Sequence, residues 1–286
     1  MLNKIIAFIG PGAMAEAMLS GLIRRNLAAP THLLVSGPRV ERGQQLQEKY
    51  GALPFTDNAE AARQADVVVL SVKPQRLTGV MENLKGSINK DALVLSIIAG
   101  ATLKKISKGL GHHTIVRSMP NTPAQIGEGI TVWTASASVT HEQKETAQAI
   151  LGALGQEVFV EDEHYLDMAT ALSGTGPAYV FMFMEAMIDA GVHMGFSRRI
   201  SEQLVVQTIS GSVDFYKTNE MHVAALRNQV TSPGGTSAEA LYYLEKAGFR
   251  TAISRAVWAA YQRSLELGKE QPVHIPESHS KDGDNE

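Results

Sequence analysis

The strongest constraint on the fold is a short glycine-rich turn near the start of the chain. The stretch AFIGPGAMAEAMLSGLIRR places Gly10, Gly12 and Ala15 directly after an apolar run and at the beginning of a helical pattern. In a strand–turn–helix unit, the first glycine allows the tight turn, the second lets backbone approach a phosphate, and a small third residue permits close packing. Amides at the start of the helix then point at the phosphates. This context favours a dinucleotide-binding turn over a plain strand–turn–helix connection.

Short β-branched runs alternate with helical patterns over the first 160 residues. Helical patterns such as 13–26 and 40–50 separate them. Continuous apolar strands divided by helices predict a parallel sheet covered on both faces, the doubly wound Rossmann-type arrangement of an α/β protein. The expected strands are KIIAFIG (4–10), HLLVSG (32–37), DVVVLSV (66–72), ALVLSII (92–98), TIVRSM (114–119) and GITVW (129–133).

The strand pattern stops after about Glu161, and only helical periodicity follows. We therefore expect a Rossmann domain over 1–161, an all-α C-terminal domain over 162–270 and a disordered polar tail over 271–286. The expected helices are 165–172, 178–194, 198–216, 221–229, 237–247 and 251–267.

One of these helices, AYVFMFMEAMIDAGVHMG (178–195), is apolar on nearly all sides. Such a helix must be covered almost completely. A small helical domain has little interior in which to bury it. The pattern favours a homodimer through the helical domain over burial as the central helix of a single chain.

The end of the second expected strand bears on which dinucleotide binds. An NAD site places Asp or Glu there to hold the ribose 2′-hydroxyl. Here the chain reads Val35-Ser36-Gly37-Pro38-Arg39, and the first acid is Glu41. A serine hydroxyl and an arginine suit a 2′-phosphate, so we expect NADPH as cofactor, with NADH possible but weaker.

Two further positions near the expected cofactor edge have alternative interpretations. Lys73-Pro74 follows a strand at the end where open α/β sheets collect ligands, but Lys73 is also explained as a solvated charge. Asn58 opens a helical pattern, and a role at the cofactor and a role as helix cap are equally compatible with it.

A second glycine-rich turn occurs far along the chain, in VTSPGGTSAEALYYLE (230–245). Thr236 and Glu239 have the spacing of a capping box, and this alone accounts for both residues. Two glycines before a helix also let successive amides bind an oxyanion, with hydroxyls of Ser232, Thr236 and Ser237 in reach. The sequence leaves both interpretations open.

Composition excludes several other classes. The 286 residues carry a net charge of −3 without a basic run, so neither a nucleic-acid nor a membrane partner is expected. There is no cysteine, which removes disulfides, thiolate catalysis and cysteine-ligated metals and is compatible with a cytoplasmic location. No other metal-ligand spacing is evident, so no metal is expected.

The second turn belongs to a longer stretch, VTSPGGTSAEALYYLEKAGFR, that resembles the hallmark segment of the pyrroline-5-carboxylate reductases. The resemblance extends to about residue 268 and includes FIGPGAMAEAM, VVVLSVKP, MPNTPA, LSGTGPAYVFMFMEAM and HMGFSRR, in the family's order. It implies NAD(P)H-dependent reduction of 1-pyrroline-5-carboxylate to L-proline, the last step of proline biosynthesis. It also implies a dimer through the helical domain, assembled further into a decamer.

The resemblance also implies which residues form the site, with the two turns meeting across a cleft. Cofactor binding falls to Gly10, Pro11, Gly12, Ala13, Met14, Ser36, Arg39, Asn58, Val72, Lys73, Pro74, Ile97, Ile98 and Ala99. Substrate binding falls to Glu220, Val230, Ser232, Gly234, Gly235, Thr236 and Ser237, with Ser237 as the catalytic residue.

The chain departs from the family pattern at a few positions. Ser237 stands where the family usually has threonine, which keeps a hydroxyl on a less restricted side chain. The usual HPG-x-LKD segment reads HVAALRN (222–228).

There are two alternative functions for the chain: another cyclic-imine or β-hydroxyacid-type NADP-dependent oxidoreductase, and a non-enzymatic nucleotide sensor. The β-hydroxyacid class needs a lysine where Val180 stands, and a sensor has no need of the second turn.

Overall fold

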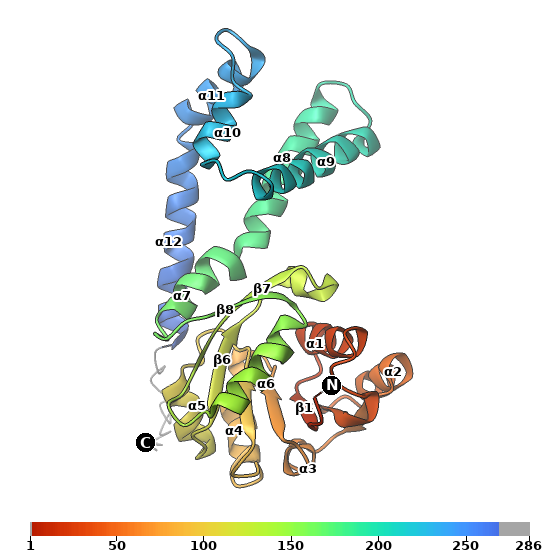
Figure 1. Ribbon diagram of the computed structural model, residues 1–286. Helices are drawn as coiled ribbons and strands as arrows, with labels where there is room; N and C mark the ends of the chain where they lie inside the picture. The colour runs from red at the N-terminus through yellow and green to blue at the C-terminus, as the bar shows by residue number, and fades with distance from the viewer. Residues whose placement is uncertain (1, 269–286) are drawn as a thin grey trace, which may run out of the picture.

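The computed structural model describes residues 2–268, so the tail expected over 271–286 lies outside the described residues. An eight-stranded sheet carries helices on both faces, and an all-helical part stands at one end of it (Figure 1). This confirms the expected fold class. The strands are β1 (Ile6–Ile9), β2 (Leu33–Ser36), β3 (Leu53–Phe55), β4 (Val67–Leu70), β5 (Leu93–Ser96), β6 (Ile115–Met119), β7 (Gly129–Ala135) and β8 (Gly155–Phe159).

The strand order is β3-β2-β1-β4-β5-β6-β7-β8. The chain winds outward from β1 to β3, then returns and winds the other way from β4, so the order reverses between β1 and β4. Every neighbouring pair is parallel except β6 and β7. The prediction of a wholly parallel sheet was therefore wrong at β7. Only the short η3 turn connects β6 to β7, which is too little chain for a parallel crossover.

The two edge strands, β3 and β8, were not among the six predicted runs. β3 has three residues with Pro54 in the middle, and β8 (Gly155–Phe159) is mostly exposed or half-buried. Edge strands bury little surface and need no continuous apolar run, so their sequences lack the pattern that identifies central strands.

The alternation of side chains along the strands builds two cores. Ile6 and Phe8 of β1 point into the core under α1, α2 and α6, whereas Ala7 and Ile9 point into the core under α3, α4 and α5. The helices of these layers are α1 (Ala13–Arg24), α2 (Val40–Tyr50), α3 (Asn58–Arg63), α4 (Leu77–Leu84), α5 (Leu103–Leu110) and α6 (His141–Gly152), with short 3₁₀ turns η1 (Pro30–His32), η2 (Pro74–Arg76) and η3 (Thr122–Ile126).

The helical part forms two separate arms (Figure 1). One is the hairpin of α8 and α9, which pack so closely that a Cβ on Gly191 would lie 2.6 Å from Ser201 Oγ. In the other arm, α10 and α11 lead into α12, which returns to pack on α7 and the π-helical turn η4. The elements are α7 (Tyr165–Ala169), η4 (Thr170–Gly174), α8 (Gly176–His193), α9 (Arg198–Lys217), α10 (Val223–Gln229), α11 (Thr236–Lys246) and α12 (Phe249–Gly268).

The arms leave large apolar side chains uncovered. In α8 only Gly191 is buried, while Phe181 is 60% and Met182 73% exposed. Exposed apolar patches of this kind mark interaction surfaces. The alternative of a central helix buried within one chain is therefore wrong, because a single chain does not cover α8.

A buried ion-pair cluster joins the helical part to the sheet. Arg117 of β6 is 2% exposed and donates to Glu163 Oε1 at 2.8 Å and to Asp167 Oδ1 of α7 at 3.2 Å. Ser264 of α12 donates to the same Asp167 oxygen at 2.8 Å. Two carboxylates and the guanidinium satisfy one another, as buried charges require. The cluster fixes where α7 leaves the sheet and where α12 returns to it.

Candidate cofactor and substrate sites

The first glycine-rich turn has no room for a side chain at its first glycine. Gly10 has φ +97°, and its amide donates to the Ser36 carbonyl oxygen at 2.9 Å. A Cβ there would lie 2.6 Å from Val72 Cγ1 and 3.0 Å from the Ser71 carbonyl carbon. Left-handed backbone and backbone contact together require glycine. The turn is thereby pressed against the end of β4, beside the point where the strand order reverses.

The second glycine faces open space instead. Gly12 is the N-cap of α1 and makes no side-chain cap, and a Cβ on it would meet no atom within 4 Å. The first amides of the helix, including those of Ala13 and Met14, have no acceptor within the helix. Uncapped amides, a helix N-terminus and free space in front of it fit the diphosphate of a dinucleotide.

A charged cluster lies against this turn. Glu16, in the first turn of α1, accepts from Arg42 of α2, from Lys49 Nζ at 2.9 Å and from Tyr50 Oη at 3.0 Å. The hydrogen bond from Arg42, followed by that from Lys49, lowers the pKa of Glu16 to about 2. Arg42 Nε also donates to the Pro11 carbonyl oxygen at 3.0 Å. The sequence did not single out this cluster, because its members are separated along the chain and form no motif.

The three residues predicted for the adenosine end have different surroundings. Ser36 is fully buried and its hydroxyl donates to Asn58 Oδ1 at 2.8 Å. Arg39 is exposed at the N-cap of α2. Asn58 does not cap α3, since the Asp57 carboxylate accepts from the Ala59 amide at 2.9 Å. The capping interpretation of Asn58 was thus wrong, and Arg39 is the exposed member of the three.

The remaining predicted cofactor residues lie at the carboxyl ends of β4 and β5. Val72 touches Gly10, and Lys73 is exposed at the N-cap of η2, with Pro74 in its first position. Beyond β5, Ile98 is buried, while Ile97 and Ala99 are half-buried. Because β1, β4 and β5 are neighbours in the sheet, these residues share one edge with the glycine-rich turn.

The loop after β5 is closed by the last helix. Gly100 has φ +72°, and a Cβ there would lie 2.8 Å from Leu267 Cβ and 2.9 Å from its carbonyl carbon. The end of α12 therefore rests directly on the loop that carries Ile97–Ala99.

The second glycine-rich turn is not a capping box. The N-cap of α11 is Gly235, without a side-chain cap, and Thr236 is already helical. Gly234 has φ +70°, and the Gly235 amide donates to the Ser232 carbonyl oxygen at 3.0 Å. This tight turn uses the Gly235 amide, so the amides left over at the helix start are those of Thr236, Ser237 and Ala238.

The other predicted substrate residues, Glu220 and Val230, are exposed on either side of α10. α10 is capped by His222, the retained histidine of the usual pattern, whose Nδ1 accepts from the Ala224 amide at 3.2 Å. Within one chain, α10 and α11 lie at the far end of the helical part from α1 and the sheet (Figure 1). The two turns therefore do not meet across a cleft within a single chain.

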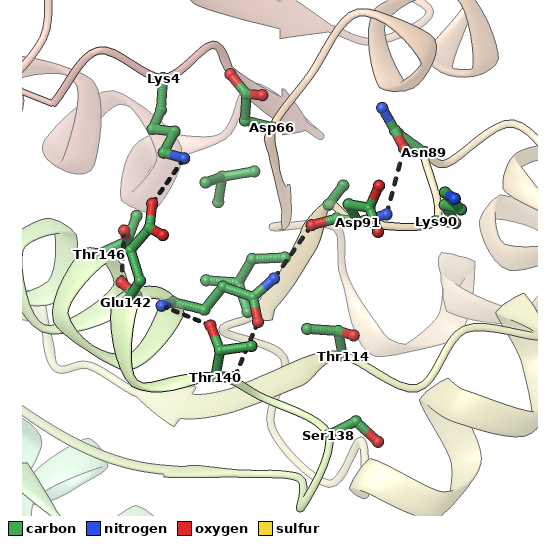
Figure 2. A pocket seen from close by; sticks show the side chains of 14 residues that line it. Lys4, Asp66, Asn89, Lys90, Asp91, Thr114, Ser138, Thr140, Glu142 and Thr146 are labelled. Carbon is green, nitrogen blue, oxygen red and sulfur yellow. Dashed lines mark hydrogen bonds and ion pairs between the residues drawn. The ribbon is translucent and has the colours of Figure 1, made fainter.

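A cavity of about 460 Å³ opens beside the amino ends of β4, β5 and β6, on the side of the sheet opposite to the first glycine-rich turn. Figure 2 shows its polar side chains bonded to one another and to nearby backbone: Lys4 pairs with Glu142 at 3.1 Å, and Gln143 donates to the Asp91 carbonyl oxygen at 3.1 Å. The cavity is remote from both glycine-rich turns, so its size does not make it the cofactor site.

Neither a metal centre nor a membrane span is found within residues 2–268. They contain no group of three or more histidine, aspartate or glutamate side chains able to hold a metal ion. None of their helices has the length and apolar character needed to span a bilayer.

The fold and the first turn together define a dinucleotide-binding oxidoreductase with a helical C-terminal part. Residues 5–100 match the family model described as NADP oxidoreductase, coenzyme F420-dependent, and residues 163–267 match the model of pyrroline-5-carboxylate reductase dimerisation. These matches support an NAD(P)H cofactor and the expected homodimer through the helical part.

Similar proteins extend the match to nearly the whole chain. The pyrroline-5-carboxylate reductase of Synechocystis sp. is 45% identical over 264 residues, which cover 92% of this chain and 98% of that protein. The crystal structure of the Plasmodium falciparum pyrroline carboxylate reductase with NADP bound has 35% identity and a TM-score of 0.87, covering 94% of this chain and 100% of that one. The Coxiella burnetii enzyme has 38% identity and a TM-score of 0.85, with the same coverage. The chain belongs to the pyrroline-5-carboxylate reductase family.

Proposed function

We propose that this protein reduces 1-pyrroline-5-carboxylate to L-proline, with NADPH preferred over NADH as the electron donor. The observation that supports this most is the pair of glycine-rich turns, each placed before a helix whose first amides have no side-chain cap. One turn suits a diphosphate and the other a small carboxylate. We also propose a domain boundary between residues 161 and 162, assembly of the dimers into a decamer, and a cytoplasmic location.

The cofactor end follows from the residues along the sheet edge. Gly10–Met14 hold the diphosphate, and Arg39 pairs with the 2′-phosphate from the start of α2. Asn58 lies at the same adenosine end, and the Ser36 hydroxyl fixes its side chain by donating a 2.8 Å hydrogen bond to it. Val72, Lys73 and Pro74 flank the dinucleotide, with Ile97, Ile98 and Ala99 near its nicotinamide end. When bound, the nicotinamide supplies a hydride.

Replacing Arg39 by alanine tests the NADPH preference. We expect KM for NADPH to rise about tenfold or more while KM for NADH changes less than about twofold, since a charge-assisted bond to the 2′-phosphate is lost only with NADPH. Steady-state kinetics with both donors measure this. Equal effects on the two donors would refute the assignment.

At the substrate end, the amides of Thr236 and Ser237 and the Ser232 hydroxyl bind the carboxylate. The Ser237 hydroxyl forms a hydrogen bond with the ring nitrogen, which orients the C=N carbon toward the cofactor. A protonated cyclic imine is already electrophilic, so no strongly acidic side chain is needed. Glu220 and Val230 border this turn, and Gly234 and Gly235 give it its shape.

Replacing Ser237 by alanine is expected to lower kcat/KM about 10- to 100-fold, which corresponds to the loss of one hydrogen bond to a charged group. The matched variant, Ser237→Thr, keeps the hydroxyl and should stay close to wild type. Steady-state rates with 1-pyrroline-5-carboxylate measure both. If Ser237→Ala turns over like wild type, Ser237 is not the catalytic residue.

The two ends of the site come together only between chains. In one chain α11 stands far from the sheet (Figure 1). The apolar side chains exposed on α8 call for a partner. In the proposed dimer, the second glycine-rich turn of one protomer lies over the cofactor edge of the other.

Initial rates with five- and six-membered cyclic imino acids, each with NADPH and NADH, test the function. We expect NADPH oxidation to depend on 1-pyrroline-5-carboxylate and to yield proline, with slower turnover of the larger ring. NADPH binding without turnover of either imine would instead favour a nucleotide sensor.

A further inference from the structure

Arg42 of α2 bonds to two parts of the phosphate-binding unit at once. Its Nε donates to the Pro11 carbonyl oxygen at 3.0 Å, and its Nη2 donates to the Glu16 carboxylate. The side chain is only 23% exposed. The guanidinium therefore ties α2 to the turn and, separately, to the first turn of α1.

The bond to Pro11 constrains the peptide that starts α1. On one side, Gly37 packs so closely that a Cβ on it would lie 2.6 Å from Pro11 Cδ. Beyond Pro11, the Gly12 amide donates to the Gly10 carbonyl oxygen at 2.8 Å. Fixing the Pro11 carbonyl fixes the plane of the Pro11–Gly12 peptide, and so places the Gly12 Cα from which α1 and its free amides start.

The second partner of the Arg42 guanidinium, Glu16, is itself held by several donors. Glu16 accepts from Arg42, Lys49 and Tyr50, and its low pKa keeps it ionised at neutral pH. A planar guanidinium can hold a carbonyl and a carboxylate in a fixed geometry, which a single ammonium cannot do.

We propose that Arg42 is a positioning residue for the cofactor, which aligns the diphosphate-binding amides by holding the Pro11 carbonyl and does not contact the 2′-phosphate. This rests on the dinucleotide part of the proposed function. The diphosphate is common to NADPH and NADH, so Arg42 serves both donors equally. Arg39, in contrast, is assigned to the group that distinguishes them.

The test is direct titration of the full-length protein with NADPH and with NADH, in the absence of any imine, for Arg42→Met. We expect both dissociation constants to rise by the same factor, about tenfold, because the amides that bind the diphosphate are no longer held in place. Thermal melts of the same samples establish that the variant is folded.

Two further variants separate position from charge. Lys49→Met removes a positive charge that pairs with Glu16, as Arg42→Met does, but it breaks no bond to the turn. Lys49 is also 63% exposed, so we expect both dissociation constants to change less than about twofold. Arg42→Lys keeps the charge but loses the fork, and its dissociation constants should lie between wild type and Arg42→Met.

Four results would overturn the proposal: a rise for NADPH alone, which would place Arg42 on the 2′-phosphate; unchanged binding in Arg42→Met; an equal loss in Lys49→Met; or full recovery in Arg42→Lys. The titrations contain no imine, so their outcome is independent of turnover. A protein that binds both donors as expected but fails to reduce 1-pyrroline-5-carboxylate refutes the proposed function and leaves the role of Arg42 intact.

Discussion

Replacing Met182 by aspartate is expected to yield a monomer that still binds NADPH but reduces 1-pyrroline-5-carboxylate at least about 100-fold more slowly. Met182 is 73% exposed on α8 in a single chain, within the surface that we propose the partner covers. An unpaired charge buried in that contact costs about 3–5 kcal/mol, enough to dissociate many dimers. Without the partner, the second glycine-rich turn is no longer over the cofactor edge.

Sedimentation at micromolar concentration gives the mass, NADPH titration gives cofactor binding, and steady-state rates give turnover. The matched control is Val158→Asp, which places the same charge at a 44% exposed position on edge strand β8. The control should keep both the dimer and the activity. Full activity in a monomeric Met182→Asp protein would refute the two-chain site.

Alanine at Gly10 and at Gly12 is expected to weaken NADPH binding by different routes. Gly10→Ala meets the Ser71 backbone and keeps a left-handed φ, so it should cost about 2–3 kcal/mol of stability and raise the NADPH dissociation constant on the order of 100-fold. Gly12→Ala meets no protein atom, so its melting temperature should stay near that of wild type. Its methyl group occupies the space needed by the diphosphate and should still weaken binding at least about tenfold.

Thermal melts and NADPH titrations of the two variants make the comparison. If Gly12→Ala binds NADPH as tightly as wild type, the open space before α1 is not the diphosphate site. If Gly10→Ala keeps wild-type stability, the turn relaxes without cost and the steric account fails.

Central strands and long helices could be predicted because each satisfies a local rule. The apolar runs that became β1, β4 and β5 are buried along their whole length, and α2 begins and ends where its pattern does, closed by Gly51 at φ +73°. In such segments burial and periodicity point to the same assignment, so the sequence alone is sufficient.

Other features depend on contacts between distant residues. Asp57 rather than Asn58 caps α3, and the Asn58 side chain instead accepts a hydrogen bond from Ser36 of β2. Thr236 and Glu239 have capping-box spacing, yet α11 starts one residue earlier than that motif requires. Arg42 gave no signal, because spacing along the chain does not show that it reaches Pro11. In the proposed dimer, the placement of the second turn over the cofactor edge depends on another chain.

The contact between Gly100 and Leu267 has a consequence for how the protein is engineered. Deleting the last turn of α12 together with all that follows it would remove Leu267, which packs on the loop assigned to the nicotinamide. A chain truncated before Leu267 is expected to lose NADPH affinity, measured by titration, while its sheet still folds.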